Sequence, residues 1–303
     1  MDTLGTLQLG FVYAIMALGV FITFRVMNTP DLTVDGSFTL GLAVSAVCAV
    51  QGLPVAGLFA GFICGAGAGV VTGLLQSKAG IHPLLAGILT MTGLYSVNLA
   101  VMGGSPNVSL LQKNTVFSEL RRVFARTDKD ILLLAAVTIL TLLCLLALGW
   151  LFHTGLGLRL RAVGNNPDMA RASSINSDRI CVLAYALANA FVGLAGATLA
   201  QYQGYADINS GAGIVMVGLA SVIIGEVVVR KQSIWGGLLA AAVGAVVYRF
   251  LIALALYADF FPAYMLRLVS AVIVAITLAI PKIREIAHNA RVKKEGRRDA
   301  GNP

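Results

Sequence analysis

Long apolar runs, separated by short polar connections, fill the chain from residue 4 to residue 280. A helix that crosses a bilayer needs roughly 20 mainly apolar residues, and about nine windows meet that requirement. The runs are continuous and lack the alternation of apolar and polar residues found in membrane barrel strands. We therefore predict an all-α integral membrane fold of about nine transmembrane helices. The windows cover residues 4–24, 36–51, 55–76, 83–103, 131–152, 179–202, 212–229, 233–257 and 264–280.

Composition agrees with this pattern. Of 303 residues, 58% are hydrophobic and 12% are charged, and the mean hydropathy is +0.85. A water-soluble core cannot hold that much apolar surface. We predict a transmembrane domain over residues 1–281, whose first helix is retained because no basic start precedes it. Residues 282–303 form a basic tail.

The net charge of +8 comes from basic residues that gather beside helix ends and in the tail. Cytoplasmic loops of membrane proteins carry an excess of Lys and Arg, so we predict an N-terminus outside and a C-terminus in the cytoplasm. Anionic lipid, and not nucleic acid, is then the partner of these cations. The basic loop residues are Arg25, Lys78, Arg159, Arg161, Arg171, Arg179, Arg230 and Lys231.

Residues 153–178 form the longest predicted cytoplasmic connection before the tail, and they are far more polar than their flanks. Asn165 and Asn166 can cap a short helix, the proline that follows suits its first turn, and Asp168 favours its positive end. We predict a surface helix over residues 167–175 that lies along the membrane and fits a partner's groove. An ordinary solvated loop is the alternative.

Two polar linkers join apolar windows, NTPDLTVDGS at residues 28–37 and QGYADINSGAG at residues 203–213. We expect Asp35 to cap a helix that begins at Gly36. The linkers would face opposite sides of the membrane, which is the relation expected of an inverted repeat of helices 1–4 and 6–9. Chance similarity between the two halves is the alternative.

Charged and polar groups inside a bilayer usually face a cavity or a partner. Helix-end positions from which long side chains reach the interface, and hydrogen bonds between helices, are the alternatives for such residues here. The candidates for a substrate pathway are Asn28, Asp31, Asp35, Asn98, Asp207, Asn209 and Arg249.

Glycine recurs at every fourth position along the third window. Small residues at that spacing let helix backbones approach closely. The same stripe could instead line a pore. Its members are Gly57, Gly61, Gly65, Gly69 and Gly73.

Motifs of enzyme chemistry are missing from the sequence. It contains no H-E-x-x-H of zinc proteases, no G-x-S-x-G of serine hydrolases and no G-x-x-x-x-G-K-[ST] phosphate-binding loop. We therefore expect no catalytic residue, metal site or cofactor, and we expect any ATP to be bound by a separate chain.

The segment GLRLRAVGNNPDMARASSIN, residues 157–176, resembles the cytoplasmic coupling segment of ABC importer permeases of the branched-chain amino acid and ribose type. LGFVYAIMALGVFITFRVMNTPDLTVDGSFTLG is similar to that family's opening helices. GIVMVGLASVIIGEVVVRKQSIWGGLLAAAVGAVV is similar to a later helix pair of the family. The turn TPDLTVDGSF most resembles the branch associated with aromatic amino acid uptake, and it departs from the branched-chain pattern.

This resemblance implies a noncatalytic permease of a bacterial inner membrane that pairs with a second permease copy or homologue. Its other partners would be a cytoplasmic dimer of ABC ATPases and an extracytoplasmic solute-binding protein. The solute would be an amino acid, with an aromatic one favoured over sugars or nucleosides. A stand-alone secondary transporter or channel is the alternative class. The residues expected to dock into the ATPase are Gly164, Asn165, Asn166, Pro167, Asp168, Met169, Ala170, Arg171, Ala172, Ser173 and Ser174.

Overall fold

The protein is described by a computed structural model over residues 3–124, 128–229, 233–257, 268, 270–276 and 279. Within these residues, seven helices are long and apolar enough to cross a membrane, which confirms the all-α membrane fold. They are α1 (Thr3–Phe21, continued by the π-helical η1, Ile22–Val26), α2 (Thr33–Val50), α3 (Pro54–Ser77), α4 (Pro83–Val101), α6 (Lys129–His153), α9 (Ser177–Gln203) and α11 (Ile234–Tyr257).

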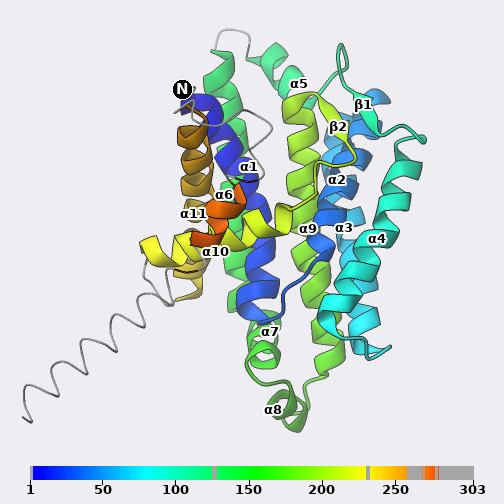
Figure 1. Ribbon diagram of the computed structural model, residues 1–303, viewed down its shortest axis with the longest axis vertical. Coiled ribbons are helices and arrows are strands. Elements are labelled where there is room, and N and C mark those ends of the chain that lie inside the picture. Colours follow the sequence, from blue (N-terminus) through cyan, green and yellow to red (C-terminus); the bar gives the residue numbers. More distant parts are fainter. Residues whose placement is uncertain are drawn as a thin grey trace, which may run out of the picture.

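Shorter elements mark the two ends of the bundle (Figure 1). α7 and α8 extend from one end, which we call the α7–α8 end. Strands β1 and β2 pair antiparallel at the other, the β-ribbon end, with Asn107 opposite Asp207. The shorter elements are β1 (Asn107–Ser109), α5 (Val116–Val123), α7 (Gly155–Asn165), α8 (Pro167–Ala172), β2 (Tyr205–Asp207) and α10 (Ile214–Val229).

The long helices coincide with seven of the predicted windows, apart from shifts of a few residues at their ends. Of the window at 264–280, the described residues 268, 270–276 and 279 are helical. The rest of that window and the tail at 282–303 lie outside the described residues.

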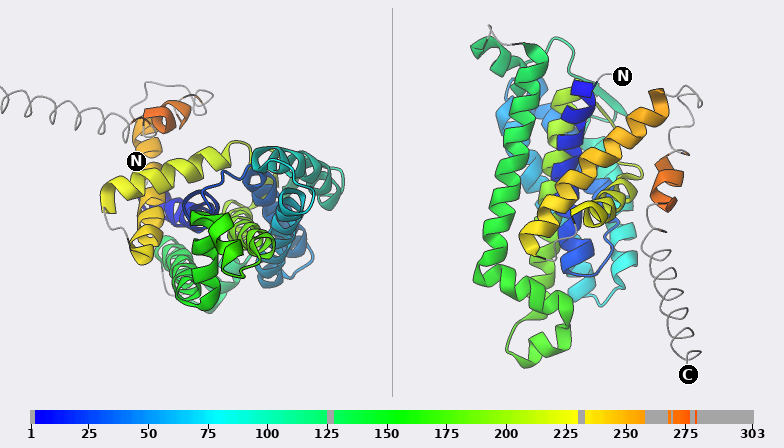
Figure 2. Two further views of the ribbon diagram at one scale, coloured as in Figure 1. Left: turned by 90° about the horizontal axis from the view of Figure 1, so that it is seen from below. Right: turned by 90° about the vertical axis from the view of Figure 1, so that its left-hand side faces the viewer.

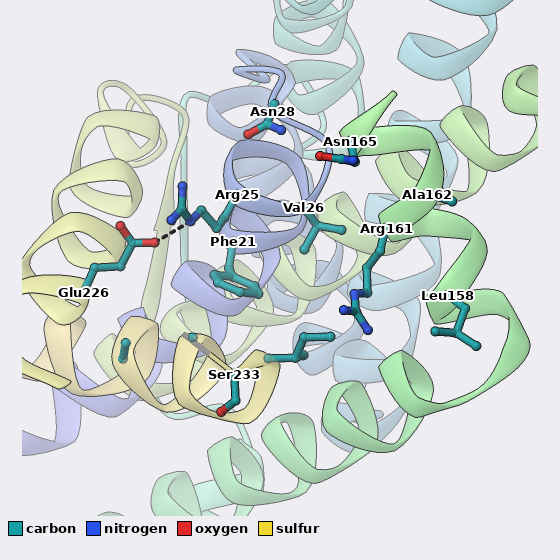
Figure 3. Close-up of a pocket in the computed structure, with 13 residues that line it drawn as sticks. Phe21, Arg25, Val26, Asn28, Leu158, Arg161, Ala162, Asn165, Glu226 and Ser233 are labelled. Atoms are coloured by element: carbon teal, nitrogen blue, oxygen red, sulfur yellow. Dashed lines mark ion pairs between the residues drawn. The ribbon is translucent and has the colours of Figure 1, made fainter. Parts of the chain in front are cut away.

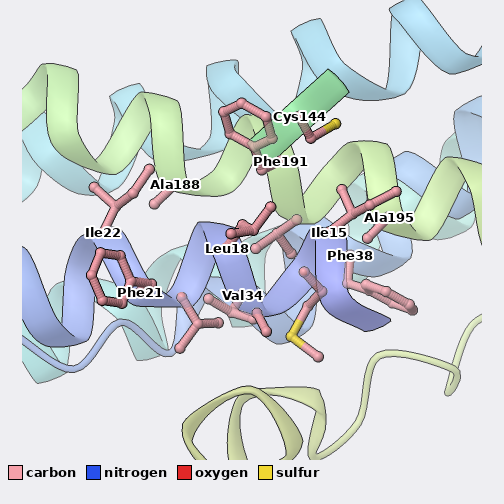
Figure 4. Close-up of a cluster of buried hydrophobic side chains, with 14 of the residues drawn as sticks. Ile15, Leu18, Phe21, Ile22, Val34, Phe38, Cys144, Ala188, Phe191 and Ala195 are labelled. Atoms are coloured by element: carbon pink, nitrogen blue, oxygen red, sulfur yellow. The ribbon is translucent and has the colours of Figure 1, made fainter. Parts of the chain in front are cut away.

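α9 is the central helix of the bundle. It packs against α1, α2 and α3, and most of its residues are buried. Figure 4 shows Ile15 and Leu18 of α1, Phe38 of α2 and Phe191 of α9 filling the space between these helices. In a bilayer, close packing of this kind, and not removal of apolar surface from water, holds helices together.

The glycine stripe of α3 packs against α9. A methyl group added at Gly65 or Gly69 would overlap the backbone of α9 at Asn189 or Tyr185. The two helices therefore touch backbone to backbone along this line. The alternative that the stripe lines a pore is wrong, because α9 occupies the space in front of it.

α2 begins inside the bundle and not at its end. Ser37 Oγ donates to Asn189 Oδ1 (2.6 Å), and Asn189 Nδ2 donates to the Asp31 carboxyl group (2.7 Å). Asn189 lies about 12 residues past Ser177, so roughly 18 Å along α9 at 1.5 Å per residue. Residues 27–32 therefore run from the end of η1 into the interior of the bundle, where α2 begins.

The window at 212–229 predicted an ordinary transmembrane helix, and α10 differs from one. It has 16 residues and lies across the other helices in Figure 1 and in the left view of Figure 2 (yellow). Its preceding linker descends from β2, and Gly211 packs directly against the backbone of Asp35. The linker and α10 together carry the chain from the β-ribbon end toward the α7–α8 end.

Asp35 fixes the point where α10 begins. Its carboxyl oxygens accept the backbone N–H groups of Gly213 and Val215, both at 2.8 Å. The prediction that Asp35 caps its own helix at Gly36 is wrong, because α2 already begins at Thr33 and Asp35 lies in its first turn. The two polar linkers thus meet inside the bundle. The inverted repeat that would relate them stays a prediction.

The glycine packing predicts a position-specific loss of stability. Gly69→Ala places a methyl group against the α9 backbone, and such overpacking costs about 1–3 kcal/mol. Gly67→Ala is the matched control on the same helix, because nothing lies within 4 Å of its added methyl group. We expect only Gly69→Ala to lower the thermal midpoint of the purified protein in detergent. Equal midpoints for the two variants would contradict the packing.

The role of Asp35 predicts a local change in backbone protection. Loss of a helix cap costs about 0.5–2 kcal/mol, so Asp35→Ala should speed amide hydrogen exchange at Gly213 and Val215. Asp207→Ala is the control, because the Asp207 carboxyl group accepts the N–H of Asn209 (2.8 Å) in a turn before α10. Unchanged exchange at the start of α10 in Asp35→Ala would show that another group holds this helix end.

Candidate translocation route and docking segment

Three cavities follow the seam between α1 and α11. The outermost, about 450 Å³, lies toward the β-ribbon end and is lined by Gly5, Leu9 and Tyr257. A middle cavity of about 730 Å³ is lined by Tyr13 and by the start of α10. The third, about 1060 Å³, lies at the α7–α8 end and is lined by Phe21. Their linings follow one another along α11, from Tyr257 in the outer cavity to Ile234 in the third, and we call this order the line of cavities.

The cavity at the α7–α8 end carries most of the charge on this line. Arg25 of η1 pairs with Glu226 of α10 at 2.7 Å, and Arg161 and Asn165 of α7 face the same space (Figure 3). The pair joins elements far apart in the sequence. The signal for it in the sequence is a carboxylate, Glu226, placed in an apolar helix; its partner could not be identified from spacing.

Arg249 joins the outer and middle cavities, because its side chain lines both. Its guanidinium carbon lies 4.9 Å from the centre of the Tyr13 ring. Tyr13 in turn stacks on Phe38, with ring centres 6.5 Å apart. Arg249 is thus the predicted pathway residue that the structure places at the junction of the outer and middle cavities.

α10 separates the middle cavity from the one at the α7–α8 end. Its first turn, at Ile214 and Met216, lines the middle cavity, while Glu226 near its last turn lines the other. Any solute moving along the seam must therefore pass α10. Since α10 starts on Asp35 and is tied to Arg25 near its end, these two contacts fix the helix that divides the route.

The remaining pathway candidates form hydrogen bonds in the framework and line none of the three described cavities, except Asn28, which borders the cavity at the α7–α8 end. Asp31 is buried and also accepts the N–H of Thr33 (2.9 Å). Asn98 Nδ2 donates to the Gly36 carbonyl (3.1 Å) and ties α4 to α2. Asp207 and Asn209 form a turn at the β-ribbon end.

The predicted surface helix is present as α8, and it is shorter than expected. The Asn166 side chain accepts the N–H groups of Asp168 (3.1 Å) and Met169 (3.0 Å), which confirms the predicted cap. The helix ends at Ala172 and not at residue 175, because Ser174 takes a positive φ of 61°. The segment is therefore helical, and its docking into a partner stays a prediction.

α8 presents most of its predicted docking residues to the outside. Met169 is 68% exposed, and Asn165, Asn166, Pro167, Asp168, Arg171, Ala172, Ser173 and Ser174 are also exposed. Ala170 is buried and holds the helix to the protein. Arg171 pairs with Asp168 (3.8 Å) and Asp178 (3.4 Å).

α7 is an element that the sequence did not predict. Its three glycines weaken the helical signal, since glycine costs roughly 1 kcal/mol against alanine in a helix. The structure explains Gly164: a methyl group there would overlap the Val26 carbonyl of η1. Asn28 Nδ2 also donates to the Gly164 carbonyl (3.2 Å). The end of α7 is therefore in direct contact with the end of η1.

Several proteins with similar sequences carry the names of transport components. The family described as branched-chain amino acid transport system, permease component, matches residues 3–280. A tyrosine transport system permease protein of Clostridioides difficile is 35% identical over 269 residues, which are 88% of this chain and 87% of that protein. No solved structure gives a significant match.

More distant relatives differ in the solute that they carry. A ribose import permease protein of Escherichia coli is 27% identical over 248 residues, 81% of this chain and 74% of that protein. A probable branched-chain amino acid transport permease protein of Methanocaldococcus jannaschii is 26% identical over 231 residues, 70% of this chain and 69% of that protein. Because this family matches nearly the whole chain, the chain belongs to the family described as branched-chain amino acid transport system, permease component.

Proposed function

We propose that this chain is the membrane-spanning permease subunit of an ATP-binding cassette importer for an amino acid, with an aromatic one favoured. The observation that carries the proposal is the pairing of an exposed capped helix, α8, with a line of cavities that ends at α7, the helix directly before it. The similarity to a tyrosine transport permease supports the aromatic solute. The similarity to ribose permeases keeps a sugar as the alternative.

The partner of α8 in this proposal is a cytoplasmic ABC ATPase. A short amphipathic helix with an exposed methionine and flanking charges suits insertion into a groove of another protein. Because α7 contacts η1 at Gly164 and Asn28, a pull on α8 would pass through α7 to Arg25 and then to α10. ATP binding in the partner would thus move the helix that divides the route.

The other proposed partners follow from the position of the cavities. Each cavity is lined by residues of α1 and α11, so a second permease copy or homologue against this face would enclose the route. An extracytoplasmic binding protein would then deliver the solute to the β-ribbon end. A stand-alone secondary transporter would have no need of an exposed α8.

Replacement of Met169 tests the ATPase contact. Met169→Glu places a charge where the partner's groove should bury an apolar side chain, and we expect a loss of about tenfold or more in ATPase affinity. Leu111→Glu is the control, because Leu111 is 79% exposed and lies beside the β-ribbon. The measurement is co-purification of the ATPase from membranes. Equal recovery of the ATPase with both variants would remove α8 from the interface.

Cysteine labelling tests the proposed orientation. Met169→Cys should react with a membrane-impermeant maleimide in inside-out vesicles and stay unlabelled in intact cells. Leu111→Cys should show the reverse pattern, because the two residues lie at opposite ends of the bundle. The unsubstituted protein measures the background from its 4 cysteines. Labelling of Met169→Cys from outside the cell would overturn the proposed orientation.

A further inference from the structure

Arg249 is a cation with no acidic partner in the part of the chain that the structure describes. Ion pairs are formed there by Arg25 and Arg171, and none by Arg249. It lies about two turns before the end of α11 at Tyr257, within an apolar span. A charge inside a bilayer is costly unless it faces a cavity or a partner, and Arg249 lines two cavities.

The contact with Tyr13 holds the Arg249 side chain in place beside these cavities. The central carbon of the guanidinium lies over the Tyr13 ring, 4.9 Å from the ring centre, and the Tyr13 ring stacks with that of Phe38, with ring centres 6.5 Å apart. A guanidinium stacked on a ring keeps its N–H groups at the edge of its plane. Those edge groups match the two oxygens of a carboxylate.

Besides Arg249, tyrosine side chains supply polar groups to the lining of the outer and middle cavities. Tyr13 and Tyr248 line the middle cavity, and Tyr202 and Tyr257 line the outer one. The Tyr248 and Ser270 hydroxyls bond to each other across the middle cavity. Aromatic rings favour other rings at offset or edge-on contact. The lining therefore suits a solute with a ring and one negative group.

The cavity at the α7–α8 end has a different character. Its Arg25 is already neutralised by Glu226 at 2.7 Å. Arg249 is the one charged residue among the described linings of the outer and middle cavities. An anionic group arriving from the β-ribbon end would therefore meet Arg249 before it reaches α10.

We propose that Arg249 and Tyr13 form a transient binding site for the carboxylate of an aromatic amino acid, at the junction of the outer and middle cavities. The carboxylate accepts hydrogen bonds from the edge of the Arg249 guanidinium, and the ring lies among the tyrosines of the lining. This site rests on the proposed function as an amino acid permease, and it names the group of the solute that the permease recognises. A neutral sugar lacks that group.

Protection of a cysteine placed in the cavity tests this site on the purified chain, without ATPase or binding protein. Ser210→Cys provides a thiol in the lining of the middle cavity, and its alkylation rate by a maleimide is measured. We expect millimolar L-tyrosine to slow alkylation, while tyramine, which lacks the carboxylate, and ribose do not. Adding Arg249→Gln should raise the L-tyrosine concentration needed by about tenfold or more, the loss expected for a charge-assisted bond.

Two further variants separate recognition from folding. Arg249→Lys keeps the charge but loses the bidentate edge, so its protection should fall between those of the parent and Arg249→Gln. Arg122→Gln, on α5 and hydrogen-bonded to Asn114 (3.0 Å), is the control and should leave protection unchanged. The tyramine comparison needs no change at Arg249, so it stands even if Arg249→Gln fails to fold.

Each outcome decides between the site and its alternatives. Equal protection by tyramine and L-tyrosine, or protection that survives Arg249→Gln, overturns carboxylate recognition by Arg249. Protection by ribose alone overturns the amino acid class. Failure of the site leaves the proposed importer intact if Met169→Glu still loses the ATPase. If Met169→Glu keeps the ATPase while L-tyrosine still protects, the site stands and the ATP-driven mechanism fails.

Discussion

The backbone contact between α3 and α9 is the constraint on which the rest of the bundle depends. Gly65 and Gly69 let α3 approach until only backbone separates it from Asn189 and Tyr185. That approach fixes α9 at the centre, where α1 and α2 also pack against it. Because lipid is as apolar as leucine, such shape matching, and not exclusion of water, sets which helices are neighbours.

A central α9 also determines where the polar groups inside the bundle lie. Asn189 holds Ser37 and Asp31, so α2 begins well inside the bundle. Asp35, in the first turn of α2, then lies where its carboxyl group can accept hydrogen bonds from the start of α10. Discontinuous helices that begin at mid-depth are the usual place for solute sites in transporters. Here they bring the start of α10 to the edge of the middle cavity.

α10 connects the two halves of the proposed mechanism. Its start rests on Asp35 and its far end on the Arg25 pair, while η1, which carries Arg25, contacts α7 at Gly164. A displacement of α8 therefore has a continuous physical path to the helix that divides the route. The ion pair is partly exposed, so its own contribution to stability is small, of the order of 1 kcal/mol or less. A weak link suits a contact that must break and reform in each cycle.

The sequence was sufficient for the features that depend on local pattern. Apolar length predicted the seven long helices, and the Asn166 and Pro167 signals predicted α8. It was insufficient where a residue's partner lies far along the chain. Asp35 was expected to cap its own helix, but its partners are about 180 residues away. The three glycines of α7 hid a helix, and of these Gly164 is needed for the close approach to η1.

The candidate site residues also divide into those that the sequence could indicate and those that it could not. Arg249 could be selected from sequence because an arginine in an apolar helix is unusual in itself. Its neighbour Tyr13 could not, because a tyrosine in a membrane helix carries no such signal. Asn98 gave the same signal as Arg249, and the structure places it in a hydrogen bond between α4 and α2. A polar residue inside an apolar helix can thus be noticed from the sequence. The sequence does not show whether that residue lines a cavity or forms a hydrogen bond between helices.

In the proposed mechanism, ATP hydrolysis by a separate protein drives solute through this chain. Uptake of labelled L-tyrosine into proteoliposomes tests it most directly, with the chain reconstituted alone or together with its co-expressed ATPase and binding protein. We expect uptake only from the complete assembly and only with ATP on the side of the ATPase. Uptake by the chain alone, driven by an ion gradient, would contradict the claim and establish a secondary transporter.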